Sequence, residues 1–306
     1  MLPLADAYQR MDDALGGIQR VEHETIPVSE SLGRVLATDL HSKLDIPPFN
    51  KAAMDGYAVA SADERTSYRL VGTIGAGSSS QAELQAGEAM KIMTGAPVPT
   101  GTGRVIVVEA AREENGSVHI LEHDPAANIH WQAQDVSEGE QILRAGRTIR
   151  AIDLANMISC GWSEVAVFRR LRVALISTGD ELVDEPGQLQ LGKIINSNGP
   201  LLRALAAAHG FEVISEATIG DDPEQTVAAL EQAVDQADIA VITGGVSVGD
   251  FDYVPQALER LGIAIHFSRL AVKPGKPTTF ASGKDRVLLG LPGNPVSVYL
   301  MFHLFV

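Results

Sequence analysis

The segment TGGVSVGDFDY, Thr243 to Tyr253, combines residues for three kinds of chemistry. Its glycines suit a backbone that wraps an anion, because successive N–H groups in a glycine turn form an anion-binding nest. Its carboxylates, Asp250 and Asp252, suit a hard cation such as Mg²⁺. The same residues contain GVSVG, a G-x-S-x-G pattern in which Ser247 would be the nucleophile of a serine hydrolase.

The serine-hydrolase interpretation is the weakest of the three. In a nucleophile elbow the helix begins almost directly after the serine, whereas here GDFD follows. The downstream histidines are poor bases, since His266 lies in a strand pattern and His303 in the apolar last segment. The chain contains neither an HGGG-type oxyanion loop nor a G-x-x-x-x-G-K-[ST] phosphate loop. A hydrolase that uses Ser247 is kept as a remote alternative.

From about residue 170 onward, apolar strand patterns alternate with amphipathic helix patterns. VALIST and DIAVITGG predict buried strands, and GPLLRALAAAHG predicts a helix that ends at Gly210. A second helix is predicted over DPEQTVAALEQAVDQA, with Asp222 as the N-cap before Pro223. This alternation is typical of an α/β fold with a mostly parallel, doubly wound βαβ sheet, in which ligands bind beyond the carboxyl ends of the strands.

The loops that follow these strands could carry the chemistry. Hard oxygen ligands for Mg²⁺ come from five carboxylates: Asp180, Glu181, Asp221, Asp250 and Asp252. Lys273 and Lys276 are positive point charges that suit a phosphate or another oxyanion. Carboxylates, lysines and a glycine nest together predict a phosphorylated ligand with a bridging Mg²⁺. In any one loop the acids could merely cap the next helix, but five loops at one edge make that alternative weaker.

The middle of the chain consists of short β patterns separated by turns. Asn115-Gly116 between two alternating runs is a strong hairpin signal. We expect an elongated linker or dimer domain from residues 1–42 plus 141–169. We also expect a β-rich domain over residues 43–140 and the α/β domain over residues 170–306. The dense middle motifs IPPFNKAAMDGYAV and KIMTGAPVPTGTG match no catalytic spacing and predict rigid loops.

Composition excludes several classes of protein. The 306 residues carry a formal net charge of −15, which argues against a nucleic-acid-binding face. The single cysteine, Cys160, excludes an internal disulfide and fits a buried helix residue in a reducing cytoplasm. Neither a signal peptide nor an apolar run long enough for a membrane helix is present. We therefore expect a cytoplasmic protein that binds neither nucleic acid nor membrane.

Six motifs, in order, resemble those of the molybdopterin molybdenumtransferase (MoeA) family, which is related to the gephyrin E domain. They are PPFNKAAMDGYAV, MTGAPVPTGTG, STGDEL, GGVSVGDFDY, KPGKP and LPGNPVS. The resemblance implies an enzyme that inserts molybdenum from molybdate into adenylylated molybdopterin. It implies use of Mg²⁺ and release of AMP and active molybdenum cofactor. The domain over residues 170–306 would then be molybdopterin-binding-like.

The resemblance also implies a homodimer whose sites lie between the α/β domain of one subunit and the β-rich domain of the other. Molybdopterin adenylyltransferase and molybdoenzyme apoproteins, or their chaperones, are candidate partners. Family chains continue into a small C-terminal β-barrel domain, which these 306 residues lack, so we expect a truncated chain. A non-catalytic molybdopterin-binding or scaffold protein is the alternative, although a scaffold has no need of all these acids and lysines.

The family's functional positions fall on particular residues of this chain. The catalytic set is Asp55, Thr94, Asp135, Glu181, Asp252, Lys273 and Lys276. The ligand-binding set is Gly244, Gly245, Ser247, Asn198, Pro292, Gly293 and Pro295. The metal set is Glu181, Asp221, Asp250 and Asp252. Two positions depart from the family pattern: AQD stands for G-E-D at Asp135, and the turn Asn196–Asn198 lacks the usual acid.

Overall fold

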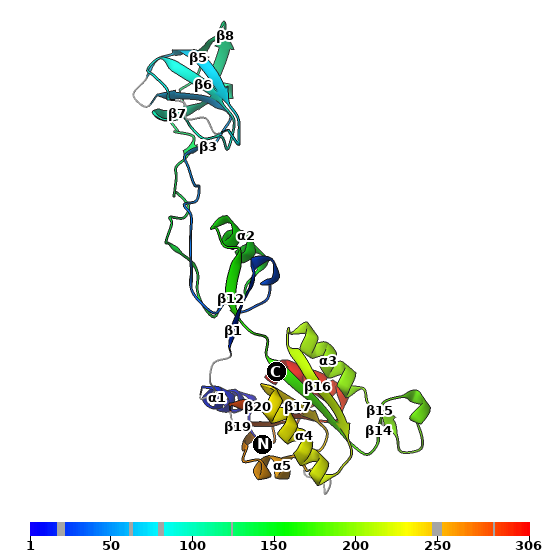
Figure 1. Cartoon of the computed structure of the whole chain (residues 1–306). Helices are drawn as coiled ribbons and strands as arrows, with labels where there is room; N and C mark the ends of the chain where they lie inside the picture. The colour runs from blue at the N-terminus through cyan, green and yellow to red at the C-terminus, as the bar shows by residue number, and fades with distance from the viewer. Residues whose placement is uncertain (17–21, 61–63, 79–82, 124, 247–252, 284) are drawn as a thin grey trace. The chain divides into compact units, whose positions relative to one another are not determined.

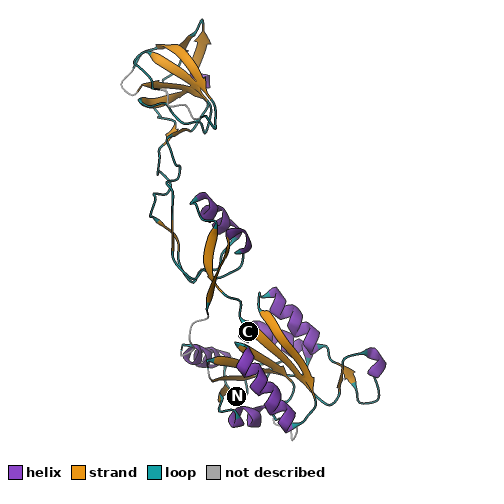
Figure 2. Cartoon of the chain, in the orientation of Figure 1, coloured by secondary structure: helices purple, strands orange, loops and turns teal. Residues whose placement is uncertain are grey.

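The chain folds as two compact units, each described here by itself (Figure 1). The computed structural model describes residues 1–16, 22–60, 64–78, 83–123, 125–246, 253–283 and 285–306. One unit comprises Met1–His23 and Phe168–Val306, and the other Glu24–Val167. The first is an α/β unit with helices on both sides of a sheet, whereas strands and loops dominate the second (Figure 2).

A six-stranded sheet in the order β16-β13-β17-β20-β19-β18 forms the centre of the α/β unit. Its strands are β13 (Arg172–Thr178), β16 (Glu212–Ile219), β17 (Ile239–Thr243), β18 (Ala264–Phe267), β19 (Thr279–Gly283) and β20 (Arg286–Leu291). The first four in spatial order are mutually parallel, and β19 is antiparallel to both of its neighbours. The carboxyl ends of β13, β16, β17, β18 and β20 therefore lie at one edge, as the sequence predicts.

Helices cover both faces of this sheet and bury two separate apolar cores. The helices are α1 (Leu4–Leu15), α3 (Asn198–Ala208), α4 (Pro223–Gln236), α5 (Val254–Arg260) and α6 (Pro295–Phe305). Leu175 of β13 packs in a core with α1, α3 and α6, whereas its neighbour Ile176 packs in the core with α4 and α5. Side chains of a strand point alternately to its two faces, so one apolar run serves both cores. The predicted doubly wound fold is confirmed, including the cap by Asp222, which accepts the Gln225 N–H over 2.8 Å.

Residues 179–197 leave the sheet between β13 and α3 and are called the excursion below. It contains β14 (Leu182–Val183) and β15 (Ile194–Ile195), which pair in parallel, and a short 3-10 turn, η3 (Pro186–Gln188). The Lys193 ammonium donates to the Asp180 carbonyl oxygen, which ties the end of the excursion back to its start. The excursion therefore returns to the ligand edge of the sheet.

The second unit contains a six-stranded sheet in the order β7-β4-β6-β5-β9-β8. Its strands are β4 (Gly56–Ala60), β5 (Ser67–Ile74), β6 (Glu88–Ile92), β7 (Thr102–Val107), β8 (Ala111–Glu114) and β9 (Ser117–Ile120). The hairpin predicted at Asn115-Gly116 joins β8 to β9, and both turn residues have positive φ, 49° and 74°. That backbone is the one for which Asn-Gly is preferred in two-residue hairpins.

The rest of the second unit consists of short paired strands and one helix. The elements are β1 (His23–Pro27), η1 (Val28–Glu30), β2 (Leu40–His41), β3 (Lys51–Ala52), η2 (Val108–Ala110), β10 (Ile129–His130), β11 (Gln141–Leu143), α2 (Ala151–Ser159) and β12 (Glu164–Phe168). Leu36, Met157 and Val167 meet in a small core, and Cys160 is buried at the end of α2, as expected. Our division into three domains stays a prediction. In the structure the first 23 residues belong to the α/β unit, where α1 contacts β18.

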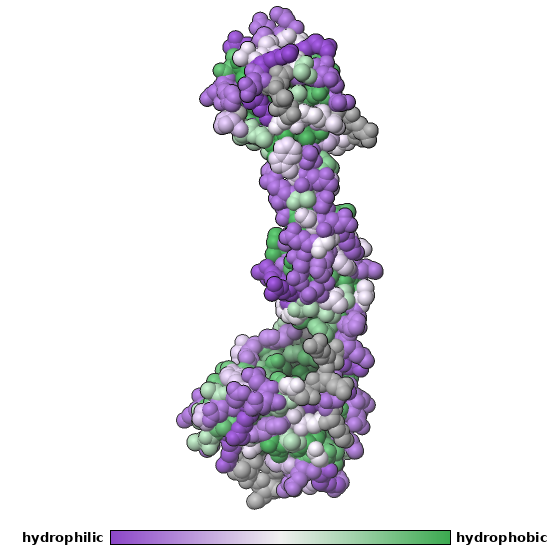
Figure 3. All heavy atoms as spheres, turned by 90° about the vertical axis from the view of Figure 1, so that its left-hand side faces the viewer, coloured by the Kyte–Doolittle hydropathy of each residue, from purple (hydrophilic) through white to green (hydrophobic). Residues whose placement is uncertain are grey.

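Hydrophilic side chains predominate on the face drawn in Figure 3, in keeping with a formal charge of −15. Among the described residues, no helix combines the length and the apolar character that crossing a membrane requires.

A buried carboxylate organises the start of α2. The Asp153 side chain is only 2% exposed and pairs with Arg147 at 3.0 Å and Arg150 at 3.1 Å. It also accepts the backbone N–H of Arg150 over 2.9 Å, which caps the helix. The hydrogen bond from the Arg150 guanidinium and these other contacts hold the pKa of Asp153 far below its ordinary value of 3.8.

Replacing Asp153 by Ala should lower the free energy of unfolding by about 2 kcal/mol at neutral pH, because a cap and a buried charge pair are lost together. Because the pKa of Asp153 is lower in the folded than in the unfolded protein, its carboxylate stabilises the fold at pH values above the unfolded pKa. The difference between the proteins should therefore shrink as the pH falls below 3.8. Urea denaturation followed by circular dichroism measures both effects. Glu122→Ala, at an exposed position of the same unit, is the control; equal stability of Asp153→Ala and the parent protein would contradict the prediction.

Candidate functional site

The ligand edge of the α/β sheet gathers loops from distant parts of the chain. Thr178, Ile219, Thr243 and Leu291 end four neighbouring parallel strands, β13, β16, β17 and β20. The loops after these strands carry most of the site residues that the sequence predicts for this unit. The strand register therefore places them at the same level across the sheet.

Two aspartates from neighbouring loops are locked together beyond β13 and β16. The Asp221 N–H donates to Asp180 Oδ1 over 3.0 Å, and the Asp180 N–H donates to Asp221 Oδ2 over 3.3 Å. The Thr178 hydroxyl lies 3.5 Å from Asp221 Oδ1. Backbone donors thus fix the direction of both carboxylates and leave their remaining lone pairs for a cation.

The glycine turn after β17 packs directly on the end of β13. Gly244 has φ +87°, and a Cβ there would lie 2.5 Å from the carbonyl oxygen of Thr178. Its N–H donates to the Leu291 carbonyl over 3.2 Å, which joins the turn to the end of β20. A Cβ on Gly245 would lie 3.2 Å from the Thr178 hydroxyl. Only a residue without a side chain fits at position 244, which explains the Gly-Gly pair.

The starts of α3 and α6 meet at this edge. The Asn198 amide donates to the Gly293 carbonyl over 2.8 Å, and the Asn294 side chain caps α6 by accepting the Val296 N–H over 3.0 Å. Pro292 is buried, and Pro295 is the first residue of α6. The Asn198 Oδ1 atom is buried without a hydrogen-bond partner among the described residues.

The lysines of KPGKP lie after β18, on a loop that packs against α6. A Cβ on Gly275 would meet the Met301 side chain at 2.5 Å, so the loop contacts α6 closely. Lys273 and Lys276 are exposed, and neither forms an ion pair with any residue that the structure describes. Their charges are therefore available to an anionic ligand.

In the β-rich unit, antiparallel pairing of β4 with β6 brings Asp55 and Thr94 together. Asp55 Oδ1 accepts from the Thr94 backbone N–H over 2.6 Å and from its hydroxyl over 2.8 Å. The backbone hydrogen bond, followed by the hydroxyl, lowers the pKa of Asp55 below 3.8. Gly56 cannot be replaced, since a Cβ there would lie 2.0 Å from the Ile106 carbonyl oxygen.

Comparison with known proteins decides the family. Residues 2–161 match the MoeA N-terminal region (domain I and II), and residues 174–306 match the probable molybdopterin binding domain. The molybdopterin molybdenumtransferase of Staphylococcus epidermidis is 36% identical over 294 residues, covering 94% of this chain and 70% of the relative. The chain belongs to the molybdopterin molybdenumtransferase (MoeA) family.

Further relatives agree with this assignment across the whole chain. The molybdopterin molybdenumtransferase of Staphylococcus aureus is 35% identical over 313 residues and matches 100% of this chain and 74% of its own length. A crystal structure of the molybdopterin biosynthesis MoeA protein from Pyrococcus horikoshii superposes with a TM-score of 0.84 at 31% identity. It covers 100% of this chain and 77% of that one. The MoeA family resemblance and the expected fold class are thus confirmed.

The metal set expected from the MoeA family is only partly within the described residues. Asp250 and Asp252, together with Ser247, lie outside them. The Glu181 side chain is exposed beside Gly179, one residue after Asp180 in the excursion. In the part of the chain that the structure describes, no group of three or more His, Cys, Asp or Glu side chains could hold a metal ion. Hard carboxylate oxygens from Glu181 and Asp221 nonetheless suit Mg²⁺, which stays a prediction.

Asp135 is exposed, and its backbone N–H donates to the Ile46 carbonyl over 2.9 Å. Sequence reasoning missed Asp45, which positions the loop that carries Asp135. Asp45 accepts from the Glu138 N–H over 2.9 Å and from the Gln132 side chain over 2.7 Å. These two bonds, the first above all, lower the pKa of Asp45.

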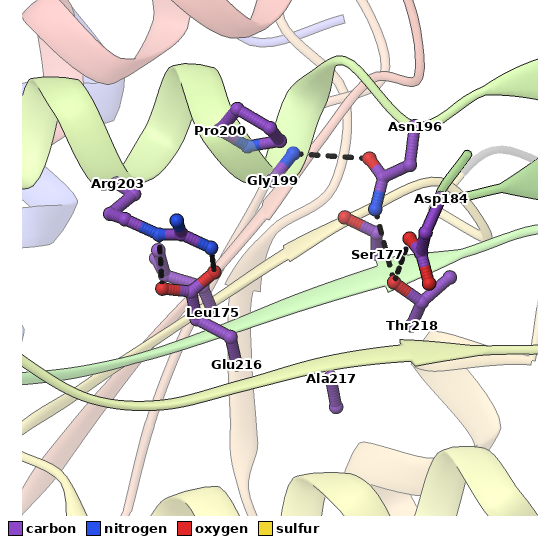
Figure 4. Close-up of a pocket in the computed structure, with 10 residues that line it drawn as sticks. All are labelled: Leu175, Ser177, Asp184, Asn196, Gly199, Pro200, Arg203, Glu216, Ala217 and Thr218. Atoms are coloured by element: carbon purple, nitrogen blue, oxygen red, sulfur yellow. Dashed lines mark hydrogen bonds and ion pairs between the residues drawn. The ribbon is translucent and has the colours of Figure 1, made fainter. Parts of the chain in front are cut away.

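Sequence reasoning also missed a polar cavity of about 430 Å³ between α3 and strands β13 and β16, called the α3 cavity (Figure 4). Asn196 lines it. Its Nδ2 donates to the Thr218 hydroxyl over 3.0 Å and its Oδ1 accepts the Gly199 N–H over 3.1 Å.

Gly244→Ala should lower the free energy of unfolding by about 3 kcal/mol, because the new Cβ meets the Thr178 carbonyl and the backbone is left-handed. Gly187→Ala, where a Cβ would meet open space, is the matched control and should change stability by less than about 0.5 kcal/mol. Chemical denaturation of both variants provides the measurement. Similar stabilities of the two variants would show that the turn does not pack as described.

Thr94→Val should raise the pKa of Asp55, since the hydroxyl donor disappears. The pKa should stay below 3.8, because the backbone N–H of residue 94 still donates. Carboxyl ¹³C chemical shifts followed over a pH titration measure it. Asp45, held by Glu138 and Gln132, serves as the internal reference and should titrate unchanged. An unaltered Asp55 titration would rule out the hydroxyl contact.

Proposed function

We propose that this protein inserts molybdenum from molybdate into the dithiolene of adenylylated molybdopterin and releases AMP and active molybdenum cofactor. The observation that carries the proposal is the match to molybdopterin molybdenumtransferases over 94–100% of the chain. The site supports it, because carboxylates, a glycine turn and two exposed lysines follow the strands at one edge of the α/β sheet.

The residues of the edge suggest how the phosphates are held. The glycine turn that begins at Gly244 would approach phosphate oxygens through backbone N–H groups other than that of Gly244, which donates to the Leu291 carbonyl. Lys273 and Lys276 would neutralise oxygens of phosphate or molybdate. Glu181 and Asp221, with Asp250 and Asp252, would hold Mg²⁺. A bound Mg²⁺ would offset negative charge as the anhydride bond breaks.

The sulfur ligands of molybdenum are expected to come from the substrate. Cys160 is only 4% exposed and lies at the end of α2 in the other unit. A buried thiol in apolar surroundings is a poor metal ligand. The dithiolene of molybdopterin supplies soft sulfurs, which suit molybdenum.

We also propose that the protein acts as a homodimer in which the β-rich unit of one copy serves the α/β unit of the other. Asp55 and Thr94 would then orient the nucleotide or the pterin from the partner. Their mutual hydrogen bonds hold the Asp55 carboxylate in one direction at an exposed position, as a ligand-orienting group requires.

Purified protein should release AMP from adenylylated molybdopterin only when molybdate and Mg²⁺ are both present, and chelation of Mg²⁺ should abolish release. Asp252→Asn and Lys276→Ala should each slow release at least about tenfold, because each removes charge that stabilises the breaking anhydride. Chromatographic quantification of AMP measures the rate. Running the assay with tungstate as well tests which oxyanion is preferred.

Glu231→Gln, on an exposed face of α4, is the matched control and should leave the rate unchanged. Full activity in both Asp252→Asn and Lys276→Ala would overturn the assigned roles. If the protein binds molybdopterin but releases no AMP under any of these conditions, it is a scaffold and the proposed reaction is wrong.

A further inference from the structure

Helices α3 and α6 lie side by side and run in the same direction. Near their first residues the Asn198 amide donates to the Gly293 carbonyl over 2.8 Å. At their far ends the rings of His209 and His303 contact each other, with centroids 5.2 Å apart. His209 is the C-cap of α3, and His303 lies in the last turn of α6. The two histidines therefore lie at the end of the helix pair that is opposite to the ligand edge.

Both imidazoles keep their nitrogens available. Each ring is exposed, and within the described ranges neither forms a hydrogen bond or an ion pair. By contrast, His266 Nε2 lies 2.8 Å from the Ser282 hydroxyl, which occupies that nitrogen. The remaining contacts of the histidine pair are with aromatic rings, such as Tyr299, whose centroid lies 4.6 Å from that of His303. A further group can therefore bind to the nitrogens of both rings.

The separation of the two rings suits a shared metal ion. Zinc binds histidine nitrogens at about 2.0–2.1 Å in tetrahedral geometry, and two imidazoles on one such ion have centroids about 5 Å apart. The observed distance of 5.2 Å agrees with this arrangement. The ring planes meet at 62°. Because the χ2 torsion of histidine is broad, rotation of each exposed ring would turn a nitrogen toward the space between them.

The ligand set selects the class of ion. Imidazole suits zinc, nickel and copper, whereas Mg²⁺ prefers carboxylate, carbonyl and water oxygens. No third His, Cys, Asp or Glu side chain joins the pair among the residues that the structure describes, so water would complete the coordination. The negative end of the α3 dipole, at His209, also favours a cation. Such an ion differs in kind from the Mg²⁺ that is expected at the ligand edge.

We infer that His209 and His303 form a binding site for a divalent transition ion such as zinc, which joins the C-terminal ends of α3 and α6. The Asn198–Gly293 bond already joins the opposite ends, so the ion would hold the helix pair at both ends. This inference goes beyond the proposed function and does not depend on it. Its direct consequence is that zinc stabilises the α/β unit.

Isothermal titration calorimetry of the untagged chain with ZnCl₂ and with MgCl₂ tests the inference. The parent protein should bind one zinc ion per chain in a manner that requires both histidines. His209→Gln and His303→Phe should each weaken this binding at least about tenfold, since even the loss of a group that only orients a metal ligand costs that much. Magnesium should give no heat that depends on either histidine.

The double variant separates a shared ion from two independent ones. Because both histidines would bind the same ion, the combined His209→Gln and His303→Phe protein should bind zinc little more weakly than either single variant. Zinc should also raise the melting temperature of the parent by a few degrees and leave those of the variants unchanged.

Two controls accompany these measurements. His303→Phe keeps an aromatic ring against Tyr299, so it removes the ligand while the packing stays. His119→Gln, at an exposed position of β9 in the other unit, is the matched control and should bind zinc as the parent does. Thermal melts without zinc show that each variant is folded.

Three results would each overturn the inference. They are zinc binding by both single variants as tight as that of the parent, losses in the two variants that simply add in the double variant, and an equal loss in His119→Gln. The contact between His209 and His303 would then be aromatic packing alone.

Discussion

Alternation of side chains along β13 is the constraint on which both regions of the ligand edge depend. Ser177 and Thr178 are adjacent in the chain and face opposite sides of one strand. Thr178 meets the glycine turn and Asp221, whereas Ser177 opens into the α3 cavity. Two neighbouring hydroxyls thereby belong to two different surroundings, and a register shift of one residue would exchange them.

Pairing of strand ends also organises the β-rich unit, where β4 and β6 are antiparallel. The start of β4 lies beside the end of β6, so Asp55 and Thr94 meet although 39 residues separate them. In both units the regular sheet fixes the ends of the strands from which the site loops leave. Rigid strands that position reactive loops are a general arrangement for binding sites.

Much of this arrangement could be predicted from the sequence, because its signals are local. The alternation of strands and helices after residue 170, the Asn115-Gly116 hairpin and the Asp222 cap each depend on a few neighbouring residues. The pairing of Asp180 with Asp221 depends on which strands are neighbours, and no local pattern records that. Ser177 lies inside the apolar run VALIST and looked like a strand interior.

The helix α1 shares a core with α6, although the two stand at opposite ends of the chain. Ala7 and Met11 pack in the same cluster as Val298 and Phe302, so the whole of Glu24–Val167 is inserted between two segments of one fold. During synthesis the inserted unit is complete long before the core that flanks it. The apolar face of α1 therefore has no partner until α6 has been synthesised. The contacts between α1 and α6 span most of the chain, and such long-range contacts raise the contact order of the α/β unit.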